Sequence, residues 1–397
     1  MRVSRLRNDR RKDRQNDRRK DKMIDNKITT SKNGNPRPPP IRQGTVFGWL
    51  RANLFSTPLN GVLTLFSLFI IYNVFSSMFD WAVLSASMQG VDRTACLGTA
   101  QGACWPLVTN KISHFIYGNY PEAERWRVNL VFLFGAVGLA ALVLPLIKEK
   151  RRIGLLMLTV YPIASYILLI GDIFGLAHVE TRQWGGLLVT LVIAVTGIVF
   201  SLPLGILLAL GRMSNLPVIH LLCVCFIEVL RGVPLIMVLF MASVMFPLFL
   251  PEGVNFDLLL RCLIGVALFS AVYMAEVVRG GLQAIPQGQY EAASAMGLSY
   301  WKSMRFIILP QALTISIPGI VNTFIGMFKD TTLVMIVGIF DLLGIIQFHT
   351  TADANWAAPQ VPVTGYVFAG AVFWVFCFIM SRYSLAVEKR LALGQKD

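Results

Sequence analysis

Residues 281–310, GLQAIPQGQYEAASAMGLSYWKSMRFIILP, connect two long apolar segments and do not resemble an ordinary connecting loop. A segment that only joins two membrane crossings is expected to be short. Here helix-forming residues follow Pro286, and Gly297 interrupts them before an aromatic pair that ends at Trp301. The pattern predicts a short helix of small residues with apolar contacts, which is typical of a helix that binds in the groove of a partner protein.

The composition of the whole chain indicates a membrane protein. Of its 397 residues, 55% are hydrophobic and 15% are charged, and the mean hydropathy is +0.61. Soluble proteins usually contain about 25% charged residues. The sequence has no GxxxxGK[ST] pattern and no Gly-Lys dipeptide, so a P-loop is excluded. Any ATP that drives the protein must therefore be hydrolysed by another chain.

Charge-free apolar runs predict an all-α, polytopic fold with about eight transmembrane helices. A bilayer core about 30 Å thick requires about 20 apolar residues in a helix. Two of the candidate spans, 153–174 and 258–280, contain ionisable residues. The others are charge-free and lie at 59–79, 128–147, 184–210, 232–250, 306–328 and 365–381.

The distribution of Lys and Arg predicts the orientation, because these residues accumulate in short cytoplasmic loops. Basic residues follow the second, fourth, sixth and eighth spans, which makes 148–152, 211–217 and 281–305 cytoplasmic. The loop at 251–257 contains acidic residues and no basic ones, and 80–127 has no basic excess. We therefore expect both termini in the cytoplasm and 80–127 outside.

Residues 1–48 are predicted to be a disordered, basic cytoplasmic tail with a Pro-rich linker. Residues 1–42 carry a net charge of +10 out of +14 for the whole chain, and no apolar core of a signal peptide is present. A basic arm can bind RNA or anionic lipid, but this one lacks interleaved aromatic residues. Membrane lipid is therefore an expected partner and nucleic acid is not.

Residues 49–180 are predicted to form an N-terminal extension with three transmembrane helices and the long external loop 80–127. Cys96 and Cys104 lie in that loop and can close a disulfide in an oxidising compartment, with two free thiols as the alternative. The other four cysteines lie inside apolar stretches, so no metal site is predicted.

Several residues between 291 and 310 recur at the fixed spacing of a known family signature. Glu291, Ala292 and Ala293 are followed at fixed distances by Gly297 and by an Ile-x-Leu-Pro sequence that ends at Pro310. This matches the cytoplasmic EAA signature, EAA-x3-G-x9-I-x-LP, of permease subunits of binding-protein-dependent ABC importers. The flanking stretches 228–240, 271–293 and 328–344 resemble the polar amino-acid uptake branch, which includes histidine and glutamine permeases. The three additional spans are similar to those of general L-amino-acid transporter permeases.

The resemblance implies a five-helix type I permease core at 181–390, with 281–310 as its cytoplasmic coupling loop. The helix 289–300 would then bind the ATPase subunit through Tyr290, Glu291, Ala292, Ala293, Gly297 and Trp301. The resemblance also implies a bacterial inner-membrane location and a chain that is not an enzyme. No cofactor would be bound by this chain, since ATP and Mg would be used by the partner ATPase. The implied partners are ABC ATPase subunits, a second permease subunit (a paralogue or a second copy) and a periplasmic amino-acid-binding protein.

Ionisable residues inside a membrane are costly and often mark a transport pathway. Glu276, close to Tyr273, is a candidate contact for the amino group of a substrate, but pairing with Arg279 is an equally good interpretation.

A second polar stretch lies at the end of an apolar run and predicts a broken or re-entrant element. It contains Lys329, Asp330, Thr331 and Thr332, where the family often has Thr-Ser-Leu in place of Thr331-Thr332-Leu333. Freed backbone groups in such an element can face a translocation cavity. Mutual neutralisation of Lys329 and Asp330 is the alternative.

The main alternative function is a secondary transporter that is driven by an ion gradient. Such proteins often contain internal repeats. No repeat relates 184–280 to 306–390, and the coupling loop has no purpose in that class.

Overall fold

The computed structural model describes residues 46–97, 102–144, 149–173, 175–251, 253–254 and 256–393. These residues form helices and connections and contain no β-strand, which confirms the predicted all-α fold. Of the predicted tail 1–48, residues 1–45 lie outside the described part, and the last three begin a helix. The chain divides into two compact units, Met1–Phe79 and Asp80–Asp397.

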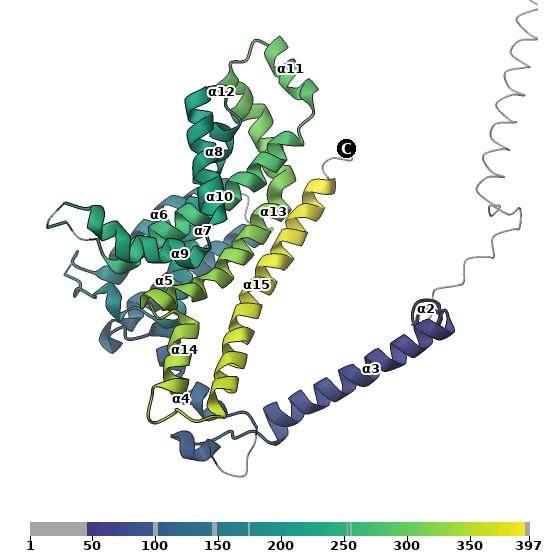
Figure 1. Cartoon of the computed structure of the whole chain (residues 1–397), viewed down its shortest axis with the longest axis vertical. Coiled ribbons are helices and arrows are strands. Elements are labelled where there is room, and N and C mark those ends of the chain that lie inside the picture. The colour runs from purple at the N-terminus through teal and green to yellow at the C-terminus, as the bar shows by residue number, and fades with distance from the viewer. Residues whose placement is uncertain are drawn as a thin grey trace, which may run out of the picture. The chain divides into compact units, whose positions relative to one another are not determined.

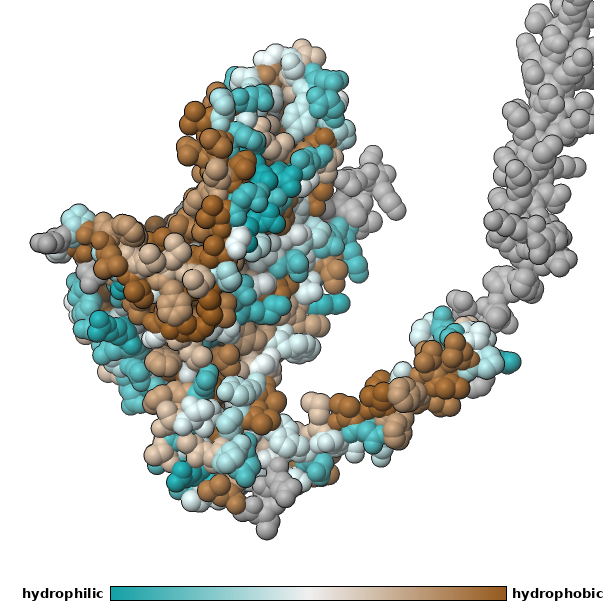
Figure 2. Space-filling view, in the orientation of Figure 1, coloured by the Kyte–Doolittle hydropathy of each residue, from teal (hydrophilic) through white to brown (hydrophobic). Residues whose placement is uncertain are grey.

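The first unit contains α2 (Val46–Asn53) and α3 (Pro58–Phe79). Helix α3 is apolar on all sides and has no buried residue, as expected of a helix that is surrounded by lipid. Much of its visible face is covered by hydrophobic residues in Figure 2. The hydroxyl of Thr64 donates to the carbonyl of Leu54 (2.8 Å) and joins the two helices.

The second unit contains the remaining helices (Figure 1). In chain order these are α4 (Trp105–Tyr117), α5 (Arg125–Val143), α6 (Lys150–Ile170), α7 (Gly186–Arg212), α8 (Pro217–Gly232), α9 (Leu235–Phe240), α10 (Leu258–Gln283), α11 (Gln287–Ala295), α12 (Tyr300–Ser303), α13 (Leu309–Asp330), α14 (Leu342–Thr351) and α15 (Val361–Leu393). Short helical turns extend or connect them at Asp80–Leu84 (η1), Arg93–Cys96 (η2), Glu122–Glu124 (η3), Thr181–Gln183 (η4), Met241–Met245 (η5), Phe246–Phe249 (η6), Met304–Ile308 (η7) and Thr331–Val337 (η8).

The described residues include seven helices that are long and apolar enough to cross a membrane, and eight when one bent pair is counted as a span. This confirms the prediction of about eight. The spans are Pro58–Leu84, Glu122–Leu142, Arg152–Ile170, Gly186–Arg212, Leu258–Gln283, Tyr300–Val337 and Val361–Lys389, with the bent pair Pro217–Gly232 and Leu235–Phe249. Five of these, counting the bent pair, follow residue 185, as the resemblance implied.

The bent pair turns by 106° between α8 and α9. Pro234 has no N–H to continue the helix of α8, and the residue before a proline is driven out of the helical region. Val233 is accordingly extended, with φ −107° and ψ 132°. The apolar residues at 218–250 are therefore divided between α8 and the helical segment that begins with α9.

Helices α7, α10 and α13 form the centre of the second unit, and α15 packs against α13. Figure 1 shows α10, α13 and α15 side by side. Glycine lets α10 and α13 approach closely, because a Cβ on Gly281 would overlap the Ser316 hydroxyl and the Ala312 carbonyl. Ser316 donates a hydrogen bond to the carbonyl of Val277 (3.2 Å) at the same contact.

The loop predicted at 80–127 is a packed structure, and we call residues 85–97 and 102–120 the cap. Its helix α4 packs against α7, α14 and α15. Leu107 and Phe115 of α4 join Ile346 and Trp356 in one apolar cluster. The backbone N–H of Cys104 also donates to the hydroxyl of Thr364 (2.8 Å) on α15.

The start of α14 depends on a fully buried acid, Asp341. One carboxylate oxygen accepts the N–H of Gly344 (2.9 Å), whereas Oδ2 has no hydrogen-bond partner among the described residues. Burial raises the pKa of this carboxyl from 3.8 to about 6, although backbone N–H groups oppose the shift. The buried charge therefore destabilises the fold at neutral pH.

We expect Asp341→Asn to stabilise the protein at pH 7.5, because Asn can still cap α14 and carries no charge. The folded pKa lies above the unfolded one, so the wild-type acid costs least below pH 3.8 and most above pH 6. The gain should approach about 3 kcal/mol above pH 6 and shrink towards pH 4. Thermal unfolding of both proteins across this range measures it.

Asp257→Asn is the matched control, because Asp257 caps α10 through the N–H of Leu259 (2.9 Å) but is exposed. It should give no such gain. A less stable Asp341→Asn protein at pH 7.5 would show that the carboxylate is charged and compensated.

Candidate functional site

The predicted coupling segment forms two short helices, α11 and α12, at one end of the second unit (Figure 1). The single helix expected at 289–300 is therefore divided. Gly297 causes the division, because its φ of +71° lies in the left-handed region, where a helix ends and where side chains other than glycine are strained. Pro286 precedes α11 with an extended ψ of 139° and fixes where that helix begins.

The exposed face of this segment is small and partly aromatic. Glu291 and Ala292 are exposed, and Trp301 is 69% exposed. Among the described residues, no side chain forms a hydrogen bond or an ion pair with the side chains of Glu291 or Trp301. These side chains are therefore available to a partner. Ala293 is 1% exposed and packs inside the second unit, and the hydroxyl of Tyr290 donates to the carbonyl of Leu282 (3.3 Å). These two residues hold the segment in place and do not face outwards.

Glu276 on α10 is the centre of an ion cluster formed by Arg212, Glu228, Arg231, Glu276 and Arg279. Its carboxylate lies 2.9 Å from Arg212 of α7, 2.9 Å from Arg279 and 3.7 Å from Arg231 of α8. Arg212 also contacts Glu228 of α8 (2.8 Å). The Glu276 side chain is 16% exposed. The pairing with Arg279 that the sequence offered as one interpretation is present in the structure.

The ion cluster joins α7, α8 and α10 close to the point where α8 ends. Arg231 lies in the last turn of α8, directly before the break at Val233, and its guanidinium lies 5.9 Å from the ring centroid of Tyr273. Glu276 lies on α10, which leads into α11. A direct contact between Glu276 and a substrate amino group would have to displace an arginine. Tyr273 is 38% exposed.

The broken or re-entrant element predicted at 329–332 is not present as a break, because α13 ends at Asp330 and continues directly as the 3-10 helix η8 within the single span Tyr300–Val337. Thr331 is buried and donates to the carbonyl of Phe328 (2.9 Å), and Thr332 donates to that of Lys329 (3.0 Å). Lys329 is exposed, and no described carboxylate lies within 4.0 Å of its ammonium group. Lys329 and Asp330 therefore do not neutralise each other through an ion pair in the described residues.

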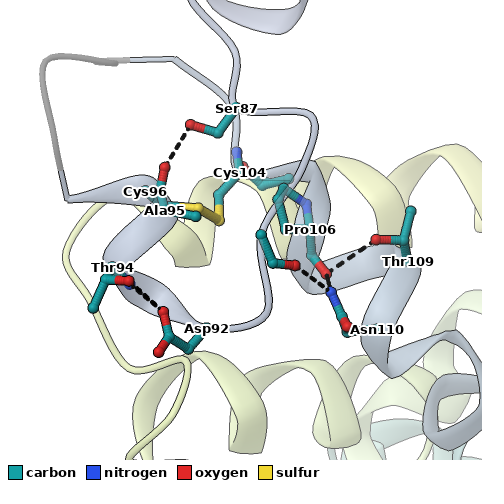
Figure 3. Close-up of a disulfide and its surroundings, with 11 residues drawn as sticks. Ser87, Asp92, Thr94, Ala95, Cys96, Cys104, Pro106, Thr109 and Asn110 are labelled. Carbon is teal, nitrogen blue, oxygen red and sulfur yellow. Dashed lines mark hydrogen bonds between the residues drawn. A yellow bond between two sulfur atoms is a disulfide. The ribbon is translucent and has the colours of Figure 1, made fainter.

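Cys96 and Cys104 form a disulfide with a Cα–Cα distance of 5.7 Å. Figure 3 shows it between two turns of the cap, where Ser87 donates to the carbonyl of Ala95 (2.8 Å) and Asp92 accepts from the N–H of Thr94 (2.9 Å). The disulfide lies remote from the coupling segment in sequence and joins parts of the cap to each other.

Sequence reasoning missed the role of Arg212 and the contact between His114 and His349. Arg212 was identified only as an orientation signal, although its position at the end of α7 placed it near other charges. His114 and His349 are separated by 235 residues, and their ring nitrogens lie 2.5 Å apart. No local sequence pattern predicts a contact of that range.

Comparison with known proteins gives a consistent result. Residues 201–393 match the family described as "Binding-protein-dependent transport system inner membrane component". The chain is 48% identical to the inner membrane amino-acid ABC transporter permease protein YhdY of Escherichia coli, over 91% of this chain and 97% of that protein. It is 40% identical to the glutamate/glutamine/aspartate/asparagine transport system permease protein BztC of Rhodobacter capsulatus, over 90% and 96% respectively.

The chain is also similar to one chain in a crystal structure of an amino acid ABC transporter with histidines. The sequence identity is 29%, the TM-score is 0.45, and the similarity covers 52% of this chain and 92% of that chain.

We expect Glu276→Gln to lower the free energy of unfolding by about 2–4 kcal/mol, because it leaves partly buried arginines without their shared carboxylate. Glu228→Gln is the matched control. The Glu228 side chain is 53% exposed and contacts one arginine, so its loss should cost about 1 kcal/mol or less. Thermal unfolding of the two purified variants measures the difference. Equal losses would contradict a central role for Glu276.

Proposed function

Because the chain belongs to the family of inner membrane components of binding-protein-dependent transport systems, we propose that it is the permease subunit of an importer for polar L-amino acids. The observation that carries this proposal is the similarity to YhdY and BztC over at least 90% of the chain. That similarity extends beyond the family match at 201–393 and includes the three-helix extension. Both relatives bear names that refer to amino acids.

The chain is a multi-pass membrane permease and not the subunit that hydrolyses ATP. Its relatives are permease components, and the sequence contains no P-loop. An ion-gradient-driven secondary transporter is not favoured, because the family works with a binding protein. ATP and Mg are assigned to the partner ATPase subunits, and no cofactor is assigned to this chain.

The exposed face of α11 and α12 is proposed as the contact for the ATPase. Glu291 and Ala292 offer a small helix surface to which another backbone can approach closely, and Trp301 offers a large apolar group. Gly297 contributes the turn between the two helices. Tyr290 and Ala293 keep this face attached to the second unit.

Movement of the coupling segment is proposed to reach the membrane through the ion cluster. Helix α10 continues into α11 after three residues, and Glu276 links α10 to the end of α8 beside the 106° bend. A bend between two helices can absorb a rotation that a continuous helix resists. Closure of the ATPase subunits would thereby change the bend and the access to the pathway.

The polar groups where α13 passes into η8 are proposed to line the pathway. Lys329 is exposed in the predicted membrane region and has no ion-pair partner among the described residues, so its ammonium group can attract the carboxylate of an amino acid. Asp330, Thr332 and the exposed ring of Tyr273 complete the candidate lining. Thr331 is buried, and its hydroxyl stabilises the junction between α13 and η8. Glu276 borders the pathway within its ion cluster.

The proposed assembly contains this permease, a second permease subunit that is either a paralogue or another copy, two ATPase subunits and a periplasmic amino-acid-binding protein. It lies in the bacterial inner membrane with both termini in the cytoplasm and contacts lipid. No nucleic-acid partner is proposed. The basic loops predicted at 148–152, 211–217 and 281–305 support this orientation.

We expect Glu291→Lys and Ala292→Trp to uncouple transport without unfolding the permease, because both side chains are exposed. ATPase that co-purifies with the permease, and ATP hydrolysis stimulated by the binding protein in proteoliposomes, should each fall at least about tenfold, equivalent to about 1.4 kcal/mol of contact energy. Gly297→Trp is less informative, since it also strains a left-handed residue.

Glu122→Lys is the control for charge reversal. Glu122 begins a short helix outside the coupling segment. Its side chain is 85% exposed and contacts only Arg125 (3.0 Å) among the described residues. It should retain stimulation and uptake. Full stimulation and uptake in a normally folded Ala292→Trp permease would rule out α11 as the coupling helix.

The orientation is tested by single-cysteine labelling. In a protein that keeps Cys96 and Cys104 but lacks the four free cysteines, we expect an impermeant maleimide to modify Val91→Cys and not Ser299→Cys in cells whose outer membrane is permeabilised. Val91 is 83% exposed and Ser299 is exposed, so both should react after lysis. Equal labelling of the two cysteines before lysis would contradict the proposed orientation.

A further inference from the structure

Arg261 is a charged residue inside a predicted span, and the proposed function leaves it without a role. It lies near the start of α10 and is partly buried. Its guanidinium donates to the backbone carbonyl of Ser243 in η5. It forms no ion pair with a described carboxylate, and its Nε is buried without a hydrogen-bond partner among the described residues. An arginine that pairs with a backbone carbonyl inside a membrane is a candidate functional residue.

The Ser243 carbonyl needs a donor from another helix because of Pro247. In an α-helix the carbonyl of residue 243 accepts the N–H of residue 247, and proline has no N–H. The backbone departs from the α-helix at this place, since η5 is a π-turn and η6, which contains Pro247, is a 3-10 turn. A carbonyl without a partner is costly in a bilayer, where no water replaces the missing donor. Arg261 therefore supplies the donor that Pro247 lacks.

The contact lies where the second half of the bent pair packs on α10. Gly265 follows Arg261 by one turn, and a Cβ on Gly265 would lie 3.1 Å from the Cβ of Ala242 in η5. Glycine thus lets the two helices approach closely beside the arginine. Helix α9 also packs against η8 in one apolar cluster. The segment that Arg261 attaches to α10 therefore borders η8, which begins with Thr331 and Thr332.

We propose that Arg261 anchors the second half of the bent pair on α10, and so sets the position of α9 beside the candidate pathway. This inference rests on the proposed function, in which the bend between α8 and α9 changes during transport. The ion cluster holds the end of α8 before the bend, and Arg261 holds the chain after it. With both sides held, a rotation at the bend reorients α9 next to η8. Arg261 is a positioning residue, because it acts through the backbone of η5.

A double-mutant cycle tests the hydrogen bond in the full-length protein in nanodiscs. Arg261→Leu leaves the Ser243 carbonyl without its donor, so the backbone around it should open more often. We expect hydrogen–deuterium exchange in peptides from 241–250 to become at least about tenfold faster. Pro247→Ala restores an N–H four residues after Ser243. In that background we expect Arg261→Leu to accelerate exchange less than about threefold.

The Pro247→Ala background separates the donor from the charge, because Arg261→Leu removes the same charge in both backgrounds. Equal acceleration in the two backgrounds, or none in either, would overturn the proposal. Arg182→Leu is the matched control. Arg182 is exposed, lies outside η5 and α10, and forms no ion pair among the described residues. Its loss should leave exchange at 241–250 unchanged.

The same cycle remains informative when Arg261→Leu does not fold. The yield of folded, monodisperse protein is then compared between Arg261→Leu and the double variant with Pro247→Ala. We expect the double variant to fold, because its Ser243 carbonyl has a donor within its own helix. A double variant that is equally unfolded would overturn the proposal.

Uptake in proteoliposomes distinguishes an anchor from a hydrogen bond that only stabilises the fold. The double variant satisfies the Ser243 carbonyl but no longer joins η5 to α10. We therefore expect it to lower the maximal rate of binding-protein-dependent uptake at least about fivefold, with KM unchanged within about twofold. Wild-type uptake by the folded double variant would overturn the positioning role. Absence of uptake by the wild-type complex would instead contradict the proposed function, and the exchange cycle does not depend on it.

Discussion

The structure depends on one constraint, which is that backbone polar groups in a bilayer must be satisfied within the protein. Long uninterrupted helices meet this requirement, so each interruption needs its own explanation. The helical conformation changes at Val233 and Pro234, where the chain bends by 106°, and at Thr331, where α13 continues as the 3-10 helix η8. Charged residues lie beside each of them, Arg231 at the first and Lys329 at the second. Departures from regular α-helix and charged side chains therefore lie together at these two positions.

The sequence predicted the number and order of the spans because bilayer thickness fixes helix length. It placed their ends less well. The span predicted at 128–147 begins at Glu122 in the structure. The prediction considered only charge-free runs, and it therefore left out charged residues that are paired within the helix. Arg127 contacts Glu124 three residues earlier (2.7 Å) and donates to the carbonyl of Ala177 (2.8 Å), and it is 1% exposed. A paired charge can enter a span where an isolated charge would end it.

The candidate site was predictable only where its contacts are local. The signature around Glu291 lies in one segment, so its spacing was visible in the sequence. The pairing of Glu276 with Arg279 follows from helical spacing, but its contact with Arg212 joins α10 to α7 across 64 positions and requires the packed helices. The interruption at Gly297 is also local and was visible in the sequence, whereas its left-handed φ of +71° and the exact ends of α11 and α12 came from the structure.

Two groups of polar side chains join separate helices of the second unit. The ion cluster around Glu276 joins α7, α8 and α10, and the contact between His114 and His349 joins α4 of the cap to α14. Away from these contacts, the chain leaves the helical conformation at Val233, before Pro234, and η8 continues α13 as a 3-10 helix. In the proposed mechanism, movement of α11 would reach the bend through Glu276, whose carboxylate lies 3.7 Å from Arg231 at the end of α8. A bend between two helices can absorb a rotation that a continuous helix resists, so the residues around Val233 are where the proposed movement would change the backbone.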